Sequence, residues 1–191
     1  MSDTSTATGK VVVNRAMSLD GFIAGPDDAM DWIFGFVAPD APIVKEIAAA
    51  TGAMLVGRRT NEVGNRMDAA RERGSASSAE AYPFSGPVFV LTHEPPDPPD
   101  PNVTYLSGDI GEAVATALSA AGGKNLEILG ADVAGQCLRL GLVDEILVYV
   151  LPVLLGDGIR FSSPGLGRID LEPVSSTRSG AVTILRFRVS K

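Results

Sequence analysis

The chain has 191 residues, of which 45% are hydrophobic, and this length and composition predict one sizeable core in a single domain. Its formal net charge of −7 disfavours a nucleic-acid or anionic-membrane partner, because phosphate groups attract basic surfaces. No apolar run reaches the roughly 18 residues that a membrane span requires. We therefore expect a protein without a membrane or nucleic-acid partner.

The sequence contains one cysteine, Cys137, and one histidine, His93. A single cysteine excludes an intramolecular disulfide and a thiolate zinc site, and a single histidine argues against a His-ligated metal centre. We therefore expect no metal and a reducing, cytoplasmic compartment. Residues 1–9 are small and polar without the features of a signal peptide, which predicts a disordered tail before one domain over residues 10–191.

Short β-branched runs and longer helical runs alternate over the first 140 residues. In chain order they are strand 10–18, helix 42–50, strand 53–57, helix 58–67, strands 87–92 and 103–107, helix 109–121, strand 125–129 and helix 131–140. Glycine, proline and aspartate punctuate an ordered loop over residues 19–32. Residues 68–83 lack an apolar period, which predicts a mobile surface segment. The alternation predicts a layered α/β domain.

The pattern changes after Gly141, where long β-rich runs follow one another without a full helix between them. The predicted strands are 144–155, 169–179 and 183–190, with a glycine-rich loop over 156–168. The last two should form a hairpin through Ser179 and Gly180. We therefore expect the C-terminal third to be antiparallel.

Basic residues open the helix that follows strand 53–57. Arg58, Arg59 and Thr60 come directly after Gly57, where unpaired backbone amides and the helix dipole attract anions. Two guanidinium groups can grip a pyrophosphate or a 2′-phosphate, and Thr60 offers a hydroxyl and a candidate N-cap. The alternative interpretation is a solvated first turn of a helix.

Two further strand ends carry residues that suit a nucleotide. Thr92 and His93 end strand 87–92, and ligands of open α/β sheets bind at the carboxyl ends of strands. His93 is either a contact for a ribose phosphate or an adenine, or a plain exposed loop residue. Gly130 precedes the helix at Ala131 and allows the backbone to approach a dinucleotide. Three such junctions predict a nucleotide site, although the chain has no GxGxxG motif.

The loop over residues 19–32 carries several carboxylates. Asp20 follows a buried strand and precedes Gly21, so it is a candidate proton relay or substrate anchor, with a turn cap as the alternative. We expect Asp27 and Asp28 to be turn acids.

Several motifs, in order, resemble the dihydrofolate-reductase-like superfamily: MSLDGFIAG with DW downstream, VGRRT, FVLTH, LGADVAGQCLRLGLVDEI and PVLLGDGIRF. More narrowly, the chain is similar to the reductase domain of bacterial riboflavin biosynthesis, the C-terminal domain of a bifunctional deaminase-reductase. The resemblance covers residues 11–189. It implies a three-layer α/β fold with a central mixed, mostly parallel sheet, flanking helices and an antiparallel C-terminal hairpin.

The resemblance also implies NADPH as cofactor and hydride transfer to a small heterocycle or a ribosylated pyrimidine, as in 5-amino-6-(5-phosphoribosylamino)uracil reduction. Position by position, it assigns cofactor contacts to Ala16, Ile23, Gly57, Arg58, Arg59, Thr60, Thr92, His93, Gly130, Ala131, Asp132, Val133, Leu155 and Gly156. Asp20 is the candidate for catalytic proton handling. The candidate substrate contacts are Asp20, Met30, Asp31 and Trp32, and the candidates for a substrate phosphate are Arg66, Arg71, Arg73 and Arg160, each with a surface charge as the alternative.

Two departures from the family pattern bear on function. Leu129 precedes Gly130 where the family commonly has a glycine pair, which leaves less room for pyrophosphate. Residues 33–39 contain no acid, whereas folate-reducing relatives hold the pteridine with a carboxylate there, so a dihydrofolate reductase is a disfavoured alternative. A non-catalytic nucleotide-binding domain is the other alternative. Exposed C-terminal edge strands predict a homodimer, because protomers of the family often pair there.

Overall fold

The computed structural model describes residues 9–36, 41–73 and 83–191. In chain order its strands and α-helices are β1 (Val11–Ser18), β2 (Phe22–Ala24), α1 (Pro42–Ala50), β3 (Thr51–Gly57), α2 (Arg58–Glu72), β4 (Val88–Leu91), β5 (Thr104–Leu106), α3 (Ile110–Ala120), β6 (Asn125–Leu129), α4 (Ala131–Arg139), β7 (Glu145–Leu151), β8 (Ile159–Arg160), β9 (Leu171–Ser179) and β10 (Val182–Val189). Two short 3-10 turns, Pro26–Asp28 and Asp31–Ile33, lie in the loop that was predicted to be ordered. The predicted tail falls mainly on residues 1–8, outside the described residues.

Eight strands form one sheet in the order β5-β4-β3-β6-β1-β7-β10-β9. The strands from β5 to β7 pair in parallel, and β10 pairs antiparallel with both β7 and β9. The predicted mixed, mostly parallel sheet with an antiparallel C-terminal hairpin is confirmed. The expectation that the whole C-terminal third is antiparallel is wrong at β7, which runs parallel to β1. Because β7 lies inside the sheet with nearly all its residues buried, its apolar run reflects a central strand.

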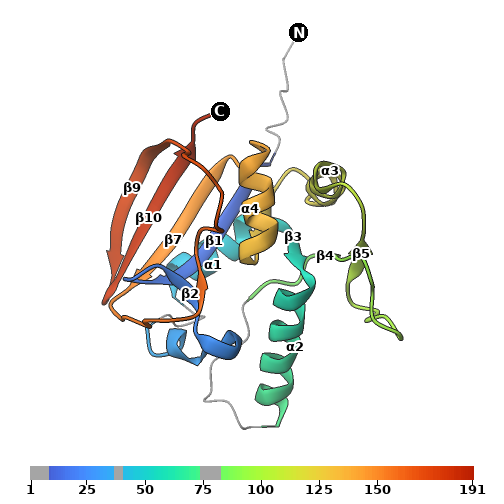
Figure 1. Ribbon diagram of the computed structural model, residues 1–191, viewed down its shortest axis with the longest axis horizontal. Helices are drawn as coiled ribbons and strands as arrows, with labels where there is room; N and C mark the ends of the chain where they lie inside the picture. The colour runs from blue at the N-terminus through green and yellow to red at the C-terminus, as the bar shows by residue number, and fades with distance from the viewer. Residues whose placement is uncertain (1–8, 37–40, 74–82) are drawn as a thin grey trace.

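Helices cover both faces of the sheet (Figure 1), with α4 in front of it and α1 behind it. The alternation of side chains along β1 divides the core accordingly. Val11 and Val13 pack in the cluster that contains α3 and α4, whereas Val12 and Ala16 pack in the cluster that contains Ile47 of α1. In the described part of the chain, no helix is long and apolar enough to cross a membrane.

The helix boundaries confirm some predictions and correct others. Asp109 caps α3, where its side chain accepts a hydrogen bond from the backbone N–H of Glu112 at 3.0 Å. Thr60 is not the N-cap of α2, because the helix already begins at Arg58 and Gly57 takes the cap position. Helix α2 also continues to Glu72, so the predicted mobile segment is helical at its start; residues 74–82 lie outside the described ranges.

The register of β1 opens the sheet at its carboxyl edge. β1 pairs with β6 from Val11 to Val13 but with β7 as far as Ser18. Beyond Val13, β6 ends and the chain turns through Gly130 into α4. The stretch from Asn14 to Ala16 therefore faces a gap in place of a neighbouring strand on that side.

Candidate nucleotide-binding cleft

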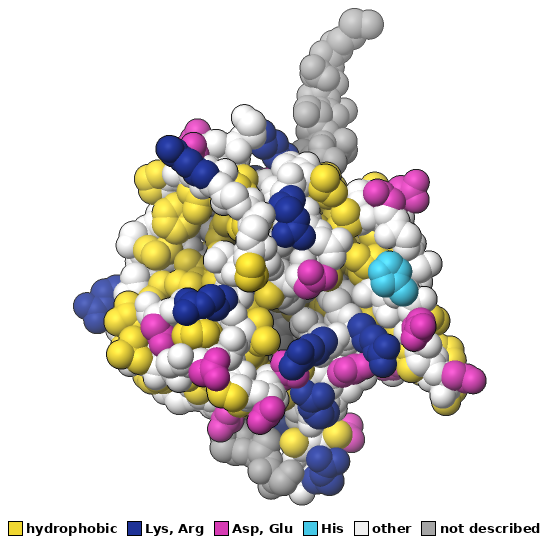
Figure 2. Space-filling view, in the orientation of Figure 1, with side chains coloured by type: hydrophobic (Ala, Val, Ile, Leu, Met, Phe, Trp, Pro, Cys, Tyr) yellow, Lys and Arg dark blue, Asp and Glu magenta, His cyan; other side chains and the backbone are white. Residues whose placement is uncertain are grey.

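A cleft of about 1000 Å³ lies at the carboxyl ends of β3, β4 and β6, beside the gap next to β1. Figure 2 shows basic and acidic side chains gathered over α2 on this face of the molecule. Most of the predicted cofactor contacts line the cleft: Ala16, Ile23, Gly57, Arg58, Arg59, Thr60, Thr92, His93, Gly130, Ala131, Asp132 and Val133. The three corners singled out in the sequence therefore meet at one cavity.

The helix starts of α2 and α4 lie close together in this cleft. Gly130 has a φ of +91°, and a Cβ atom there would lie 2.4 Å from Oγ1 of Thr60. A Cβ atom at Gly57 would lie 3.2 Å from Cγ2 of Val133. Close packing of two helix N-termini brings two sets of unpaired backbone N–H groups to the same cavity, which is a favourable environment for an anion.

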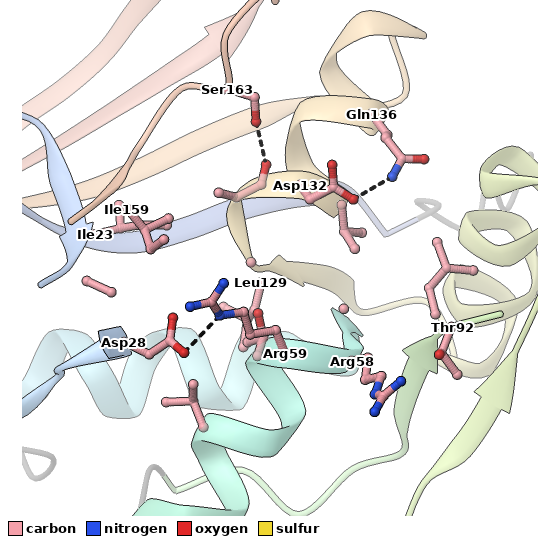
Figure 3. Close-up of a pocket in the computed structure, with 18 of the residues that line it drawn as sticks. Ile23, Asp28, Arg58, Arg59, Thr92, Leu129, Asp132, Gln136, Ile159 and Ser163 are labelled. Atoms are coloured by element: carbon pink, nitrogen blue, oxygen red, sulfur yellow. Dashed lines mark hydrogen bonds and ion pairs between the residues drawn. The ribbon is translucent and has the colours of Figure 1, made fainter. Parts of the chain in front are cut away.

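The side chains of Arg58 and Arg59 point apart (Figure 3). Arg58 donates from Nε to Glu62 at 2.8 Å, one turn along α2. Arg59 donates from Nε to Asp28 at 2.8 Å, across the cleft mouth. These hydrogen bonds to carboxylates raise the pKa of both arginines. The sequence suggested that both arginines bind one phosphate, but the two guanidinium groups lie on different sides of the cleft.

Asp28, which was predicted to be a turn acid, also forms ion pairs with α2. Its backbone is left-handed, with a φ of +61°, and its side chain is 13% exposed. Besides Arg59, it has Arg66 at 3.6 Å. The loop that carries Asp28 is thus fastened to α2 by two guanidinium groups.

Two residues that the sequence analysis missed support the start of α4. Arg15 lies on β1 and is 7% exposed, and its Nη2 donates to the backbone carbonyl of Gly130. Burial lowers the pKa of Arg15 to about 10, which leaves it charged at neutral pH. Ser163 donates from Oγ to the carbonyl of Ala131 at 3.1 Å. An arginine inside the β-branched run of β1 was the available signal for the first of these contacts.

Asp20 lies outside the lining of the cleft. Its carboxylate accepts hydrogen bonds from the hydroxyl of Ser18 at 2.6 Å and from the backbone amides of Leu155 at 3.1 Å and Gly156 at 2.7 Å. These bonds, that of Ser18 first, lower the pKa of Asp20 to about 2. A carboxylate so strongly held as an anion is a poor proton carrier at neutral pH. The placement favours a role in fastening the loop after β7 to the end of β1. Leu155 and Gly156, which were predicted as cofactor contacts, do not line the cleft either.

The candidate substrate contacts are divided between two places. Met30 lines both the cleft and an adjoining cavity of about 260 Å³, and Asp31 lines the adjoining cavity. Trp32 lines neither; its Nε1 donates to the carbonyl of Ala29 at 3.1 Å and its ring packs against the core.

The four candidate phosphate-binding arginines are divided in the same way. Arg66 and Arg71 line the adjoining cavity. Arg160 lies over the ring of Phe22, 4.6 Å from its centroid, and Arg73 is the C-cap of α2; neither lines a cavity.

The model of the RibD C-terminal domain family matches residues 9–185, nearly the whole chain. The chain belongs to the RibD C-terminal domain family. A relative in this comparison is the uncharacterised protein YwjB of Bacillus subtilis (strain 168), which is 26% identical over 152 residues, covering 78% of this chain and 80% of YwjB.

Solved structures share the fold of this RibD C-terminal domain. A candidate riboflavin biosynthesis protein from Shewanella sp. PV-4 has a TM-score of 0.77 at 23% identity, covering 95% of this chain and 99% of that one. Dihydrofolate reductase from Enterococcus faecalis, complexed with NADP(H), has a TM-score of 0.61 at 15% identity, covering 96% and 98%. The deaminase/5-amino-6-(5-phosphoribosylamino)uracil reductase of Thermotoga maritima has a TM-score of 0.63 at 17% identity, and the match covers 96% of this chain but 57% of the longer enzyme. These likenesses confirm the dihydrofolate-reductase-like fold.

The turn before α4 is where this RibD C-terminal domain departs from the family pattern. Gly130 keeps the turn before α4 free of a side chain, and Leu129 packs against the cluster around Met54 and Val90. The glycine pair of the family is therefore reduced to one glycine, and Leu129 lines the cleft beside it. In the same wall, Nε and Nη1 of the buried Arg15 make no hydrogen bond within the described residues.

Proposed function

We propose that the protein is an NADPH-dependent reductase that transfers a hydride to a small heterocyclic or ribosylated pyrimidine substrate, such as 5-amino-6-(5-phosphoribosylamino)uracil. The convergence of three strand ends and two helix N-termini on one cleft carries this proposal. Membership of the RibD C-terminal family supports it. So does the shared fold of the Thermotoga maritima deaminase/reductase and of the Enterococcus faecalis dihydrofolate reductase, which is complexed with NADP(H).

NADPH would supply the hydride, and its parts fit different walls of the cleft. The amides at Gly130 to Val133 and the hydroxyl of Thr60 would hold the pyrophosphate. Arg58, which extends toward the end of β4, would take the 2′-phosphate beside the adenosine site at Thr92 and His93. Ala16 and Ile23 would flank the nicotinamide, because they line the opposite, loop-side part of the cleft.

The cavity next to the cleft would take the substrate. It shares Asp28, Met30 and Val63 with the cleft, so a ligand there would lie next to the proposed nicotinamide position. Arg66 and Arg71 would pair with a substrate phosphate, and both already hold carboxylates of the protein, Asp28 and Asp68. A substrate phosphate would therefore have to displace these ion pairs.

We further propose a homodimer built on β9. This edge strand is exposed along its whole length and carries Leu171 and Val174, which are 39% and 47% exposed. Figure 2 shows apolar side chains gathered on the β9 side of the molecule. An uncovered edge of this kind is a surface for pairing. Sedimentation at micromolar concentration should give a dimer, and Val174→Lys should give a monomer; a monomeric wild-type protein would contradict the proposal. The cytoplasm remains the proposed compartment.

Calorimetric titration with NADPH tests the cofactor assignment. Wild-type protein should bind NADPH more tightly than NADH, and Arg58→Ala should reduce that preference because it removes the partner of the 2′-phosphate. Arg168→Ala is the matched control, since Arg168 is an exposed arginine paired with Asp170 outside the cleft. Equal binding of NADPH and NADH by the wild-type protein would contradict the assignment.

Transfer of deuterium from labelled NADPH tests the reaction. The label should appear in a phosphoribosylaminopyrimidine and not in dihydrofolate. Transfer to dihydrofolate at an enzyme-like rate would identify a folate reductase instead. Tight NADPH binding without transfer to any candidate would identify a nucleotide-binding domain without catalysis.

A further inference from the structure

Among the residues that the structure describes, Arg15 is a buried cation without a carboxylate partner. Its Nη2 donates a hydrogen bond to the carbonyl of Gly130, and the guanidinium lies 5.7 Å from the centroid of the Phe161 ring. Nε and Nη1 are enclosed and make no hydrogen bond in the described parts of the chain. A buried charge left without an opposite charge is costly, so this guanidinium marks a place for an anion from outside the protein.

The other arginines that line the cleft differ from Arg15 in this respect. Arg58 is paired with Glu62, and Arg59 with Asp28. Among the described residues, the Arg15 guanidinium forms no ion pair with a carboxylate. Its charge is therefore available to a ligand without breaking an internal ion pair.

The hydrogen bond from Arg15 also fixes the first peptide of α4. The carbonyl of Gly130 accepts from Arg15 and from the backbone N–H of Ala134 at 3.2 Å, so it points along the helix. In a trans peptide the following N–H points the opposite way. The amide of Ala131 is thereby directed out of the helix start and toward the cleft.

The first turn of α4 carries an acid at the cleft. Asp132 lines the cleft, and its exposed carboxylate accepts a hydrogen bond from Gln136 at 2.8 Å. An anionic ligand at the helix start would meet this negative charge. We expect the positive charge of Arg15, which is hydrogen-bonded to the same turn, to offset this repulsion of the ligand.

We propose that Arg15 is a positioning residue for the pyrophosphate group of a dinucleotide, which it holds through the orientation of the Gly130 turn and through its own buried charge. The inference rests on the proposed cleft for a dinucleotide, but it does not require that hydride transfer takes place.

Calorimetric titration with two nucleotide fragments tests this role. ADP-ribose contains the pyrophosphate, whereas adenosine 2′-monophosphate lacks it and reaches only the Arg58 side. Arg15→Gln keeps a donor for the carbonyl of Gly130 but removes the charge, and should weaken ADP-ribose binding about 10- to 100-fold. Binding of adenosine 2′-monophosphate should stay unchanged. Arg15→Lys should recover part of the lost ADP-ribose affinity, which a purely structural role would not produce.

Arg139→Gln is the matched control, because it removes the same charge from the exposed end of α4. It should leave both affinities unchanged. Circular dichroism and thermal unfolding establish that each variant is folded. A measurement on the unaltered protein needs no variant: inorganic pyrophosphate should displace ADP-ribose but leave adenosine 2′-monophosphate bound.

Three results would overturn the inference: a folded Arg15→Gln variant with wild-type ADP-ribose affinity, an equal loss of both fragments, or a failure of pyrophosphate to compete. ADP-ribose binding that depends on Arg15, together with no NADPH oxidation, would instead leave the inference standing and refute the proposed reductase activity.

Discussion

Replacing Gly130 by alanine tests whether the α4 turn is held against α2. The backbone φ of +91° is strained for any residue with a Cβ atom and costs about 1–3 kcal/mol. The new methyl group would also lie 2.4 Å from Oγ1 of Thr60. Because threonine is stiff at χ1, moving that hydroxyl off its rotamer adds about 0.5–1.5 kcal/mol. We expect Gly130→Ala to destabilise the protein by about 3 kcal/mol and to weaken NADPH binding.

Gly108→Ala separates the two costs. Gly108 has a φ of +95° but nothing within 4 Å of a built Cβ atom, so alanine there meets strain without collision. Urea unfolding should therefore show a smaller loss for Gly108→Ala, by about 1 kcal/mol. Adding Thr60→Ala removes the hydroxyl, and should restore about that amount to Gly130→Ala but nothing to Gly108→Ala. Equal losses at the two glycines, or no rescue by Thr60→Ala, would refute the proposed contact.

The remaining predictions concern three carboxylates and the Cys137 thiol. Asp28→Asn frees Arg59 for a ligand phosphate and should tighten NADPH binding by up to about fivefold in calorimetry; weaker NADPH binding would contradict this expectation. Glu62→Gln, which frees Arg58, should likewise tighten the binding of NADPH but leave that of NADH unchanged. The Asp20 carboxylate has its pKa lowered to about 2, so the stability it contributes is present above about pH 4 and is lost as pH falls toward 2; urea midpoints should fall less on acidification for Asp20→Asn, and an equal fall would argue against its hydrogen bonds. Burial raises the pKa of the Cys137 thiol to about 12, so iodoacetamide should label it in the unfolded protein but not in the native one, as mass spectrometry would show; rapid native labelling would contradict this.

The order and type of most elements were readable from the sequence because strands and helices differ in the period of their apolar residues. The short strands β2 and β8 were missed, since they lie in segments that were predicted as loops. Strands β1, β3 and β6 are largely buried on both faces, and their short apolar runs predict them within a few residues. Pairing direction was not readable. The run in β7 looks the same whether its neighbour is β1 in parallel or β10 antiparallel, because a strand buried between two others is apolar in both cases.

The three corners of the cleft could be predicted because each lies at the end of a strand, and those at Gly57 and Gly130 also begin a helix; both are local features. Asp20 could not be placed in the same way. Its position after a strand suggested a reactive group, but its partners Leu155 and Gly156 lie far along the chain and hold the carboxylate in a loop contact. Arg15 was missed for a related reason, because its proximity to Gly130 depends on the register at which β6 ends beside β1.

The divergence of Arg58 and Arg59, in contrast, follows from helix geometry alone. Consecutive residues of an α-helix project about 100° apart, so two adjacent arginines in a first turn do not face one phosphate together. The helix begins at Arg58, which commits both residues to this geometry. One side chain then reaches the β4 side and the other the Asp28 loop. Each arginine can therefore bind a different group of a ligand, and single alanine substitutions at the two positions should have different effects. Arg58→Ala should reduce the preference for NADPH over NADH, whereas Arg59→Ala should reduce the affinity for both.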